Sequence, residues 1–325
     1  MRTVRDIGEF GLIRRLARLL PTSPDVFEGV GDDCAVVRLG DTVALVSCDL
    51  FLEHVHFRRS TATPEDIGWK AAAAALSDIA AMGGAPLYVL VSLACPGDTE
   101  IAFVEGLCQG LTAAAGQAGA VIVGGDTARS PEAIVLDVAV IGQTVGGRYL
   151  CRKGARPGDV LAVTGHVGRS AAGLHALEHG HDGPALLAAH RRPQPRYAEG
   201  RWLCRRDGVH AMIDISDGLV QDAGHLAEGE GLGMDIDPGR LVSAPELERY
   251  CEEHGLDALT FMLTGGEDYE LACAIAPDVY DGTVRAFQET FDTALTGVGR
   301  FTDAWRGVRV AGQEPAAGGF DHFAR

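Results

Sequence analysis

The chain has 325 residues, of which 46% are hydrophobic and 22% are charged, and its formal net charge is −17. This length exceeds what one hydrophobic core usually serves, so two domains are expected. The acidic balance argues against nucleic acid or an anionic membrane as a partner, because both need clustered cations. No apolar run approaches the roughly 18 residues that span a bilayer. The eight cysteines include no C-x-x-C pair, so we expect a cytoplasmic protein with reduced thiols.

The first twenty residues place Phe10, Ile13, Leu16 and Leu20 at helical spacing among several arginines. This pattern predicts an amphipathic helix. A signal peptide is not indicated, because no uninterrupted apolar segment is present.

Acidic residues stand near the first two predicted strands. Asp32 and Asp33 are adjacent, and two neighbouring carboxylates repel each other unless a cation is bound. A turn explains Asp32, whereas a metal role is predicted for Asp33. Asp49 follows the apolar residues 43–46 and is expected at or just past a strand end, where a carboxylate can hold a metal. His56 then stands in an alternating apolar pattern that turns its ring to the opposite face; a surface histidine after a turn is the alternative.

The next segment begins with a strong helix start. Thr63 is the predicted N-cap, Pro64 takes the first helical position, and Asp66 stands three residues after the cap. Within this helix Asp78 lies on a face of alanines, where a buried carboxylate would need a partner. We therefore weigh a metal-binding Asp78 against one that faces solvent.

A glycine pair marks the most specific phosphate-binding signal in the first half of the chain. The apolar residues 120–123 predict a buried strand that ends in Gly124, Gly125, Asp126 and Thr127. Glycines leave backbone N–H groups free to meet phosphate oxygens, and Asp126 could hold a cation that bridges them. A tight turn is the alternative.

Other elements complete the predicted first domain: strands over residues 86–94 and 133–144, with a helix capped by Asp98 between them. A basic segment rich in glycine and proline follows and indicates a domain boundary. We place the first domain at residues 1–147 and the second at residues 148–325.

The boundary segment contains Arg152 and Lys153, the clearest concentration of positive charge in this acidic chain. It could bind a triphosphate or act as a solvated linker. His175, His179 and His181 might suggest zinc, but no third ligand has a suitable motif around it, and we favour a solvated helix end.

The second domain repeats the pattern of acids after a strand. A strand is predicted to lead into Asp214, Ser216 and Asp217, and an amphipathic helix runs on through Leu226. Ser216 or Asp217 could be a simple N-cap, whereas a helix N-terminus flanked by acids suits a metal-bound phosphate. Glu267 follows a glycine pair and is either part of a polar turn or a ligand contact.

Six aspartates share small neighbours, and most stand at strand or helix ends: Asp33, Asp49, Asp78, Asp126, Asp214 and Asp217. Hard oxygen ligands in this number suggest several Mg²⁺ ions. Two or more such ions can neutralise a triphosphate and a second phosphate and align them for in-line transfer. The phosphate loop, the protein-kinase loops and the G-x-S-x-G elbow are absent from the sequence. If the protein uses ATP, metals held by carboxylates must replace the phosphate loop.

The order and spacing of the motifs resemble the thiamine-monophosphate kinase family over essentially the whole chain. The motifs are Gly8-Glu9-Phe10, Gly31-Asp32-Asp33, Asp49 with Val55-His56-Phe57, Leu76-Ser77-Asp78-Ile79, Gly124-Gly125-Asp126-Thr127, Asp214-Ile215-Ser216-Asp217, Gly265-Gly266-Glu267-Asp268 and Asp321-His322-Phe323. The resemblance implies ATP-dependent phosphorylation of thiamine monophosphate to thiamine diphosphate. It also implies an α/β (α+β) fold of two domains, shared with aminoimidazole ribonucleotide synthetase. The protein would be a homodimer whose first domains join their sheets into a barrel.

The resemblance also assigns residues to ligands. Mg²⁺ would be held by Asp33, Ser47, Cys48, Asp49, Asp78, Asp126, Asp214 and Asp217. ATP would be contacted by Gly125, Asp126, Arg152 and Ser216, and thiamine phosphate by His56, Glu267 and Phe320. The substrate phosphate is already an ionised nucleophile, so no general base is assigned.

Three residues depart from the family pattern. Cys48 replaces a usual Thr, which leaves a backbone carbonyl contact to metal but removes the hydroxyl. Ala75 replaces a common Asn, and Phe320 replaces a Tyr or Trp, which keeps ring stacking and loses a polar tip.

Rival functions remain open at this point. Selenophosphate synthetase and aminoimidazole ribonucleotide synthetase share the fold, but the former should show a reactive Cys with a nearby Lys early in the chain, and the sequence has none. A metal-dependent phosphohydrolase and a nucleotide-binding module without turnover are the alternatives from other classes.

Overall fold

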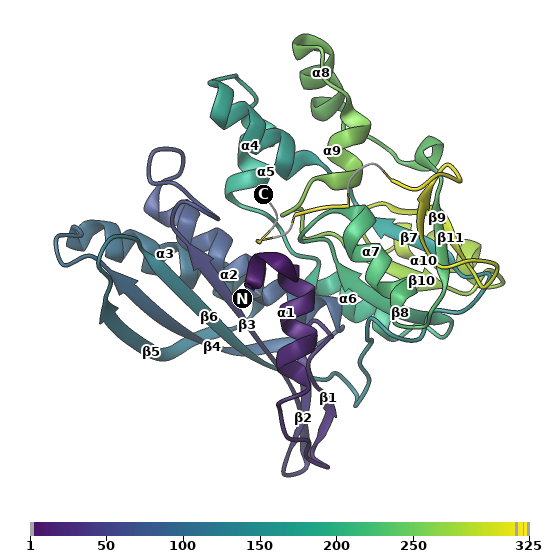
Figure 1. Ribbon diagram of the computed structural model, residues 1–325, viewed down its shortest axis with the longest axis horizontal. Coiled ribbons are helices and arrows are strands. Elements are labelled where there is room, and N and C mark those ends of the chain that lie inside the picture. Colours follow the sequence, from purple (N-terminus) through teal and green to yellow (C-terminus); the bar gives the residue numbers. More distant parts are fainter. Residues whose placement is uncertain (1–2, 316–317, 321, 324–325) are drawn as a thin grey trace.

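Two six-stranded mixed sheets organise the computed structural model, which describes residues 3–315, 318–320 and 322–323. Each sheet belongs to one α/β domain, and the two domains lie side by side (Figure 1). The predicted two-domain α/β fold is confirmed. The boundary at 147/148 falls in the connection between the two sheets and stays a prediction. Asp321 of the terminal motif lies outside the described residues.

The first sheet has the strand order β1-β2-β3-β6-β4-β5, and only β4 and β5 pair in parallel within it. Its strands are β1 (Val26–Glu28), β2 (Ala35–Leu39), β3 (Thr42–Leu52), β4 (Ala85–Cys95), β5 (Val121–Arg129) and β6 (Val135–Gln143). Alternate residues of β6 are buried, as expected for a sheet with one covered face.

Helices α2 (Pro64–Ala81) and α3 (Ile101–Ala118) cover that face and enclose the first hydrophobic core. The other face is left open in the single chain, although it carries the exposed apolar side chains of Leu50, Tyr88 and Leu90. We call this surface the open face.

The second sheet has the order β12-β9-β11-β7-β10-β8. Its strands are β7 (Val160–Thr164), β8 (Val209–Asp214), β9 (Gly233–Ile236), β10 (Leu271–Ile275), β11 (Leu295–Thr302) and β12 (Gly307–Val310). The remaining helices are α1 (Gly8–Ala17), α4 (Arg169–His179), α5 (Pro184–Arg191), α6 (Tyr197–Cys204), α7 (Leu219–Glu228), α8 (Pro245–His254), α9 (Ala258–Thr264) and α10 (Tyr280–Gln288), with short 3-10 helices at Val4–Asp6 and Pro238–Arg240. No helix among the described residues is both long and apolar enough to cross a membrane.

Helix α2 is the element that joins the two domains. It lies against α6 so closely that a Cβ on Gly200 would stand 2.1 Å from the carbonyl oxygen of Ala80. Near its start, the Trp69 indole N–H donates to the carbonyl of Pro193, 2.9 Å away. The side chains that α2 presents toward the second domain are therefore held in place from both sides.

The predicted start of α2 is confirmed. Thr63 is the N-cap, its hydroxyl accepts the backbone N–H of Asp66, and Pro64 takes the first position. The helix that was expected from Asp98 begins instead after Glu100, at Ile101.

Several predicted strand ends are wrong because pairing extends the strands. Asp49 lies inside β3, opposite Val138 of β6, rather than at a strand end. The glycine pair lies inside β5, where Gly125 pairs with Val91. His56 lies in the turn after β3 and not in an alternating strand, and its Nδ1 accepts the backbone N–H of Leu52 at 2.9 Å.

The alternative in which Ser216 or Asp217 is the N-cap of α7 is not what the structure shows. Gly218 takes that position without a side-chain cap. The carboxylate of Asp222, one turn into the helix, accepts the backbone N–H groups of Ser216, Asp217 and Gly218 at 3.0, 2.9 and 2.9 Å. The helix thus fixes the preceding loop from its own first turn.

Candidate active site

Three carboxylates from distant parts of the chain meet where the domains join. Asp33 precedes β2, Asp78 lies near the end of α2, and Asp214 ends β8. One oxygen from each lies within 4.8 Å of the others. We call these three residues the acidic centre.

Charge repulsion and burial make the acidic centre costly without a cation. Burial, followed by the charge of Asp33, raises the pKa of Asp214 to about 8. Burial and the charges of Asp49 and Asp214 also raise the pKa of Asp78. Asp33 Oδ2 is buried and has no hydrogen-bond partner among the residues that the structure describes. Carboxylate oxygens are the ligands that Mg²⁺ prefers, and the buried Asp33 oxygen lacks a hydrogen-bond partner. The acidic centre therefore fits a divalent cation such as Mg²⁺.

Neighbouring side chains orient these carboxylates. The Ser47 hydroxyl donates to Asp78, and the Ser77 hydroxyl donates to Asp214 at 2.6 Å. Arg152 Nε donates to Asp33 at 2.8 Å. Ser77 was missed by sequence reasoning, although it stands directly before Asp78. Because Ser77 lies on α2 and Asp214 on β8, this bond ties the acidic centre to both domains.

Two further predicted metal ligands flank the acidic centre. Burial and then the charge of Asp217 raise the pKa of Asp49 to about 6. Burial and then the charge of Glu9 raise the pKa of Asp217 to about 6. The two aspartates come from different domains and repel each other. Negative charge is therefore found on both sides of the domain junction, beyond the acidic centre itself.

The predicted ATP contact Ser216 and the predicted substrate contact Glu267 are neighbours. The backbone N–H of Glu267 donates to the Ser216 carbonyl at 2.7 Å. Sequence reasoning missed Asp222, which fixes this loop; an acid in the first turn of α7 was the available signal.

The three predicted substrate residues converge through His322 and Lys70. The ring centroid of His322 lies 5.0 Å from that of His56 and 4.9 Å from that of Phe320. Lys70 Nζ lies 2.6 Å from Glu267 Oε2. Burial, then the charges of His322 and Lys70, lower the pKa of His56 to about 4, so its ring is neutral near pH 7.

Cys48, Gly125 and Asp126 are not brought to the acidic centre. Cys48 is exposed on β3, and its neighbours Ser47 and Asp49 point to the opposite face of the sheet. Asp126 is exposed on the edge strand β5, three strands from β3, which is about 14 Å at the usual strand spacing. Within one chain, the side chains of Cys48 and Asp126 lie on the open face, whereas Gly125 pairs with Val91, whose side chain packs on the covered face.

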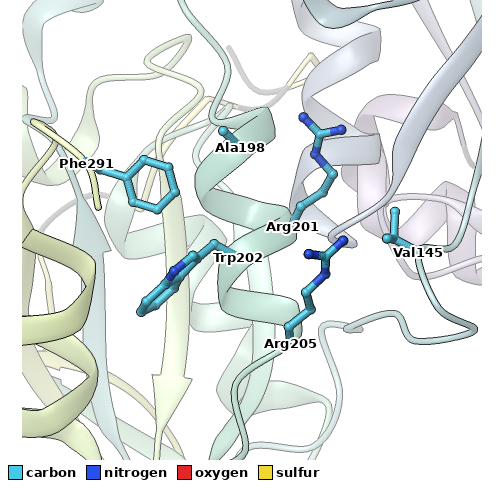
Figure 2. Close-up of a pocket in the computed structure, with 6 residues that line it drawn as sticks. All are labelled: Val145, Ala198, Arg201, Trp202, Arg205 and Phe291. Atoms are coloured by element: carbon cyan, nitrogen blue, oxygen red, sulfur yellow. The ribbon is translucent and has the colours of Figure 1, made fainter. Parts of the chain in front are cut away.

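A shallow pocket of about 260 Å³ lies away from this acidic site, beside α6. Its lining comes from both domains: Val145, Ala198, Arg201, Trp202, Arg205 and Phe291 (Figure 2). The pocket contains no carboxylate and none of the predicted site residues. The candidate active site is therefore the acidic centre with its surroundings, and not this pocket.

Comparison with known proteins agrees with this fold. The family model of the AIR synthase related protein N-terminal domain matches residues 31–144, and that of the C-terminal domain matches residues 156–311. The chain is thus an AIR synthase related protein with both domains of that class.

Its relatives define a narrower group. A thiamine-monophosphate kinase of Mycobacterium tuberculosis is 38% identical over 85% of this chain and 83% of that protein. One of Escherichia coli is 36% identical over 98% of each. A solved structure described as AaThiL complexed with AMPPCP and TMP has a TM-score of 0.88 and 34% identity, and covers 99% of both chains. The chain belongs to the thiamine-monophosphate kinase family.

Proposed function

We propose that this protein transfers the γ-phosphoryl group of ATP to the phosphate of thiamine monophosphate, yielding thiamine diphosphate and ADP. The observation that carries the proposal is the acidic centre at the domain junction. The loop that follows Asp214 contacts two of the predicted substrate residues, since the backbone N–H of Glu267 donates to Ser216 and that of Phe320 donates to Asp217. Membership of the thiamine-monophosphate kinase family supports the choice of acceptor, and the related structure that holds AMPPCP and TMP supports both substrates.

Six of the predicted metal ligands would hold the Mg²⁺ ions. Asp33, Asp78 and Asp214 form the acidic centre, Ser47 bonds Asp78, and Asp49 and Asp217 would add further carboxylates. Bound Mg²⁺ would supply positive charge that neutralises the donor and acceptor phosphates. Cys48 could contribute only its backbone carbonyl, because its side chain points to the open face.

Arg152 is the cation best placed for the ATP phosphates. Its guanidinium now pairs with Asp33, and although burial opposes it, the charge of Asp33 raises the pKa of Arg152. An arginine in such surroundings stays charged and can offer other N–H groups to phosphate oxygens. Ser216 stands in the loop that Asp222 fixes, so its polar groups would meet the nucleotide in a set orientation.

We also propose a homodimer whose open faces meet. The open face carries exposed apolar side chains from three strands, including Leu50 at 57%, Tyr88 at 48% and Val121 at 57% exposure. Exposed apolar side chains gathered on one face of a sheet are typical of an interface. Asp126, which lies on β5 at this face, and its neighbour Gly125 would then make their metal and ATP contacts near the dimer interface.

On the acceptor side, His56, Glu267 and Phe320 would bind the thiamine moiety. Phe320 is 50% exposed and can stack on a heteroaromatic ring. The acceptor phosphate is ionised near neutral pH and attacks in line without a general base. The protein's part is to align two anions that would otherwise repel each other.

The test is an assay of the purified protein with Mg²⁺, ATP and thiamine monophosphate that follows thiamine diphosphate and ADP together. We expect equal amounts of both products, and neither product when one substrate is omitted. Consumption of ATP or thiamine monophosphate alone would identify a hydrolase instead. ADP formation without thiamine diphosphate would show that the acceptor is wrong.

A further inference from the structure

Lys70 is a buried cation beside the predicted substrate site. It is one of only two lysines in the chain and belongs to α2. Its residue is 4% exposed, and its ammonium lies 2.6 Å from Glu267 Oε2, in the loop before β10 of the second domain. Burial lowers the pKa of Lys70, and the charge of Glu267 opposes that effect. A buried lysine is tolerated when it is paired in this way.

His190 completes a buried polar group with this pair. Its two ring nitrogens lie 3.4 and 3.3 Å from Lys70 Nζ, and its Nδ1 lies 3.5 Å from Glu267 Oε2. The Ser170 hydroxyl lies 3.1 Å from the same Nδ1 and orients the ring. Burial, then the charge of Lys70, lower the pKa of His190 to about 3, so the ring is neutral. The group therefore holds one positive and one negative charge.

These contacts leave one carboxylate oxygen of Glu267 available. Oε2 is engaged by Lys70, whereas Oε1 accepts no hydrogen bond from any residue within the described part of the chain. The backbone of Glu267 has a φ of +64°, which is unusual for a residue with a side chain, and its N–H is held by Ser216. Backbone and side chain are thus both fixed, and the free oxygen has a set direction.

We propose that Lys70 and His190 are positioning residues that aim the free oxygen of Glu267 at an N–H donor of the acceptor. A carboxylate can only accept hydrogen bonds. Thiamine monophosphate offers such a donor in the exocyclic amino group of its aminopyrimidine ring. The inference rests on the proposed function and adds a basis for substrate specificity. Helix α2 of the first domain, through Lys70, orients the Glu267 carboxylate of the second domain, which would recognise the pyrimidine.

The first test substitutes Lys70→Met, which keeps the length of the side chain and removes its charge. Without its partner, Glu267 can rotate, so we expect the KM for thiamine monophosphate to rise about tenfold, while kcat and the KM for ATP change less than about threefold. Selectivity for thiamine monophosphate over an analogue whose pyrimidine amino group is replaced by oxygen should fall as well. A purely structural role would not change that selectivity.

Two further variants make the result decisive. His190→Gln removes the ring and should raise the same KM in the same direction, which preserves the test if Lys70→Met does not fold. The control, Arg192→Met, removes a different ion pair between the domains, formed by Arg192 and Asp66 one turn before Lys70 on α2. We expect the KM of this control to stay within about twofold of the wild type.

The outcomes separate this inference from the proposed function. If the wild type makes no thiamine diphosphate, the proposed function fails. If the wild type is active and Lys70→Met and His190→Gln keep its KM and selectivity, the positioning role is wrong. An equal rise of KM in Arg192→Met would also overturn it, because the effect would then belong to the domain junction in general.

Discussion

At the scale of single residues, the site is made of carboxylates that are unfavourable in the folded protein when no cation is present. Asp214 illustrates this best, because its pKa of about 8 compares with an ordinary value of about 4 in an unfolded chain. Between these values the folded protein binds the proton more strongly than the unfolded chain does. The free energy of unfolding must then fall as the pH rises through this window.

We predict that the metal-free protein, kept in a chelator, loses a few degrees of melting temperature between pH 6.5 and 8.0. The lowered pKa of His190 acts in the opposite direction, but its effect is confined to lower pH because an unfolded histidine titrates near 6.5. Asp214→Asn should remove much of the loss. Added Mg²⁺ should raise the melting temperature more at pH 8.0 than at pH 6.5, since it binds the deprotonated carboxylates. A melting temperature that rises with pH in the chelator would contradict this account.

At the scale of elements, the site depends on how closely α2 packs against α3. A Cβ on Gly110 of α3 would stand 1.9 Å from the carbonyl oxygen of Glu65, and one on Gly68 of α2 would stand 2.0 Å from that of Leu107. The two helices therefore touch through their backbones. This contact holds α2, and with it Lys70 and Asp78, against the sheet.

Gly110→Ala should destabilise the protein by about 3 kcal/mol, because the added methyl group must push the helices apart. The matched control is Gly116→Ala in the same helix, where the added Cβ meets nothing within 4 Å. That change should stabilise the protein by about 0.5–1 kcal/mol, since alanine favours the helix. Denaturant unfolding of both variants measures the difference. Similar effects in the two variants would mean that the close helix contact does not matter.

At the scale of the whole molecule, the predicted site residues of one chain do not all lie together. Asp126 lies on the open face, and the acidic centre lies on the covered side of the same sheet. The same face also exposes apolar side chains that a partner subunit would bury. Assembly and activity should therefore be lost together.

We expect Tyr88→Asp to yield a monomer with at least about a hundredfold lower turnover, because a carboxylate cannot be buried unpaired in an apolar interface. Light scattering after size-exclusion chromatography and the kinase assay measure the two effects. Ile101→Asp is the control, since Ile101 is 76% exposed at the start of α3, where an acid is favourable. It should remain dimeric and active. A fully active monomer would refute the link between assembly and activity.

The sequence by itself determined those features of the fold that depend only on residues close together in the chain. Thr63, Pro64 and Asp66 predict the start of α2 correctly, because capping is a contact between residues three apart. The order and spacing of the acidic motifs also identified the family, and three of those acids, Asp33, Asp78 and Asp214, do converge.

Only the tertiary structure decided which side chains share a site. Asp49 lies inside β3, and Asp126 lies on the open face, because strand length and register follow from pairing with strands that are distant in the sequence. Lys70 and Glu267 form an ion pair although nearly two hundred residues separate them. The sequence around either residue does not indicate that the other is its partner. Local chemistry sets caps and periodicity. Burial, register and the convergence of charges arise from contacts between segments that are far apart in the chain.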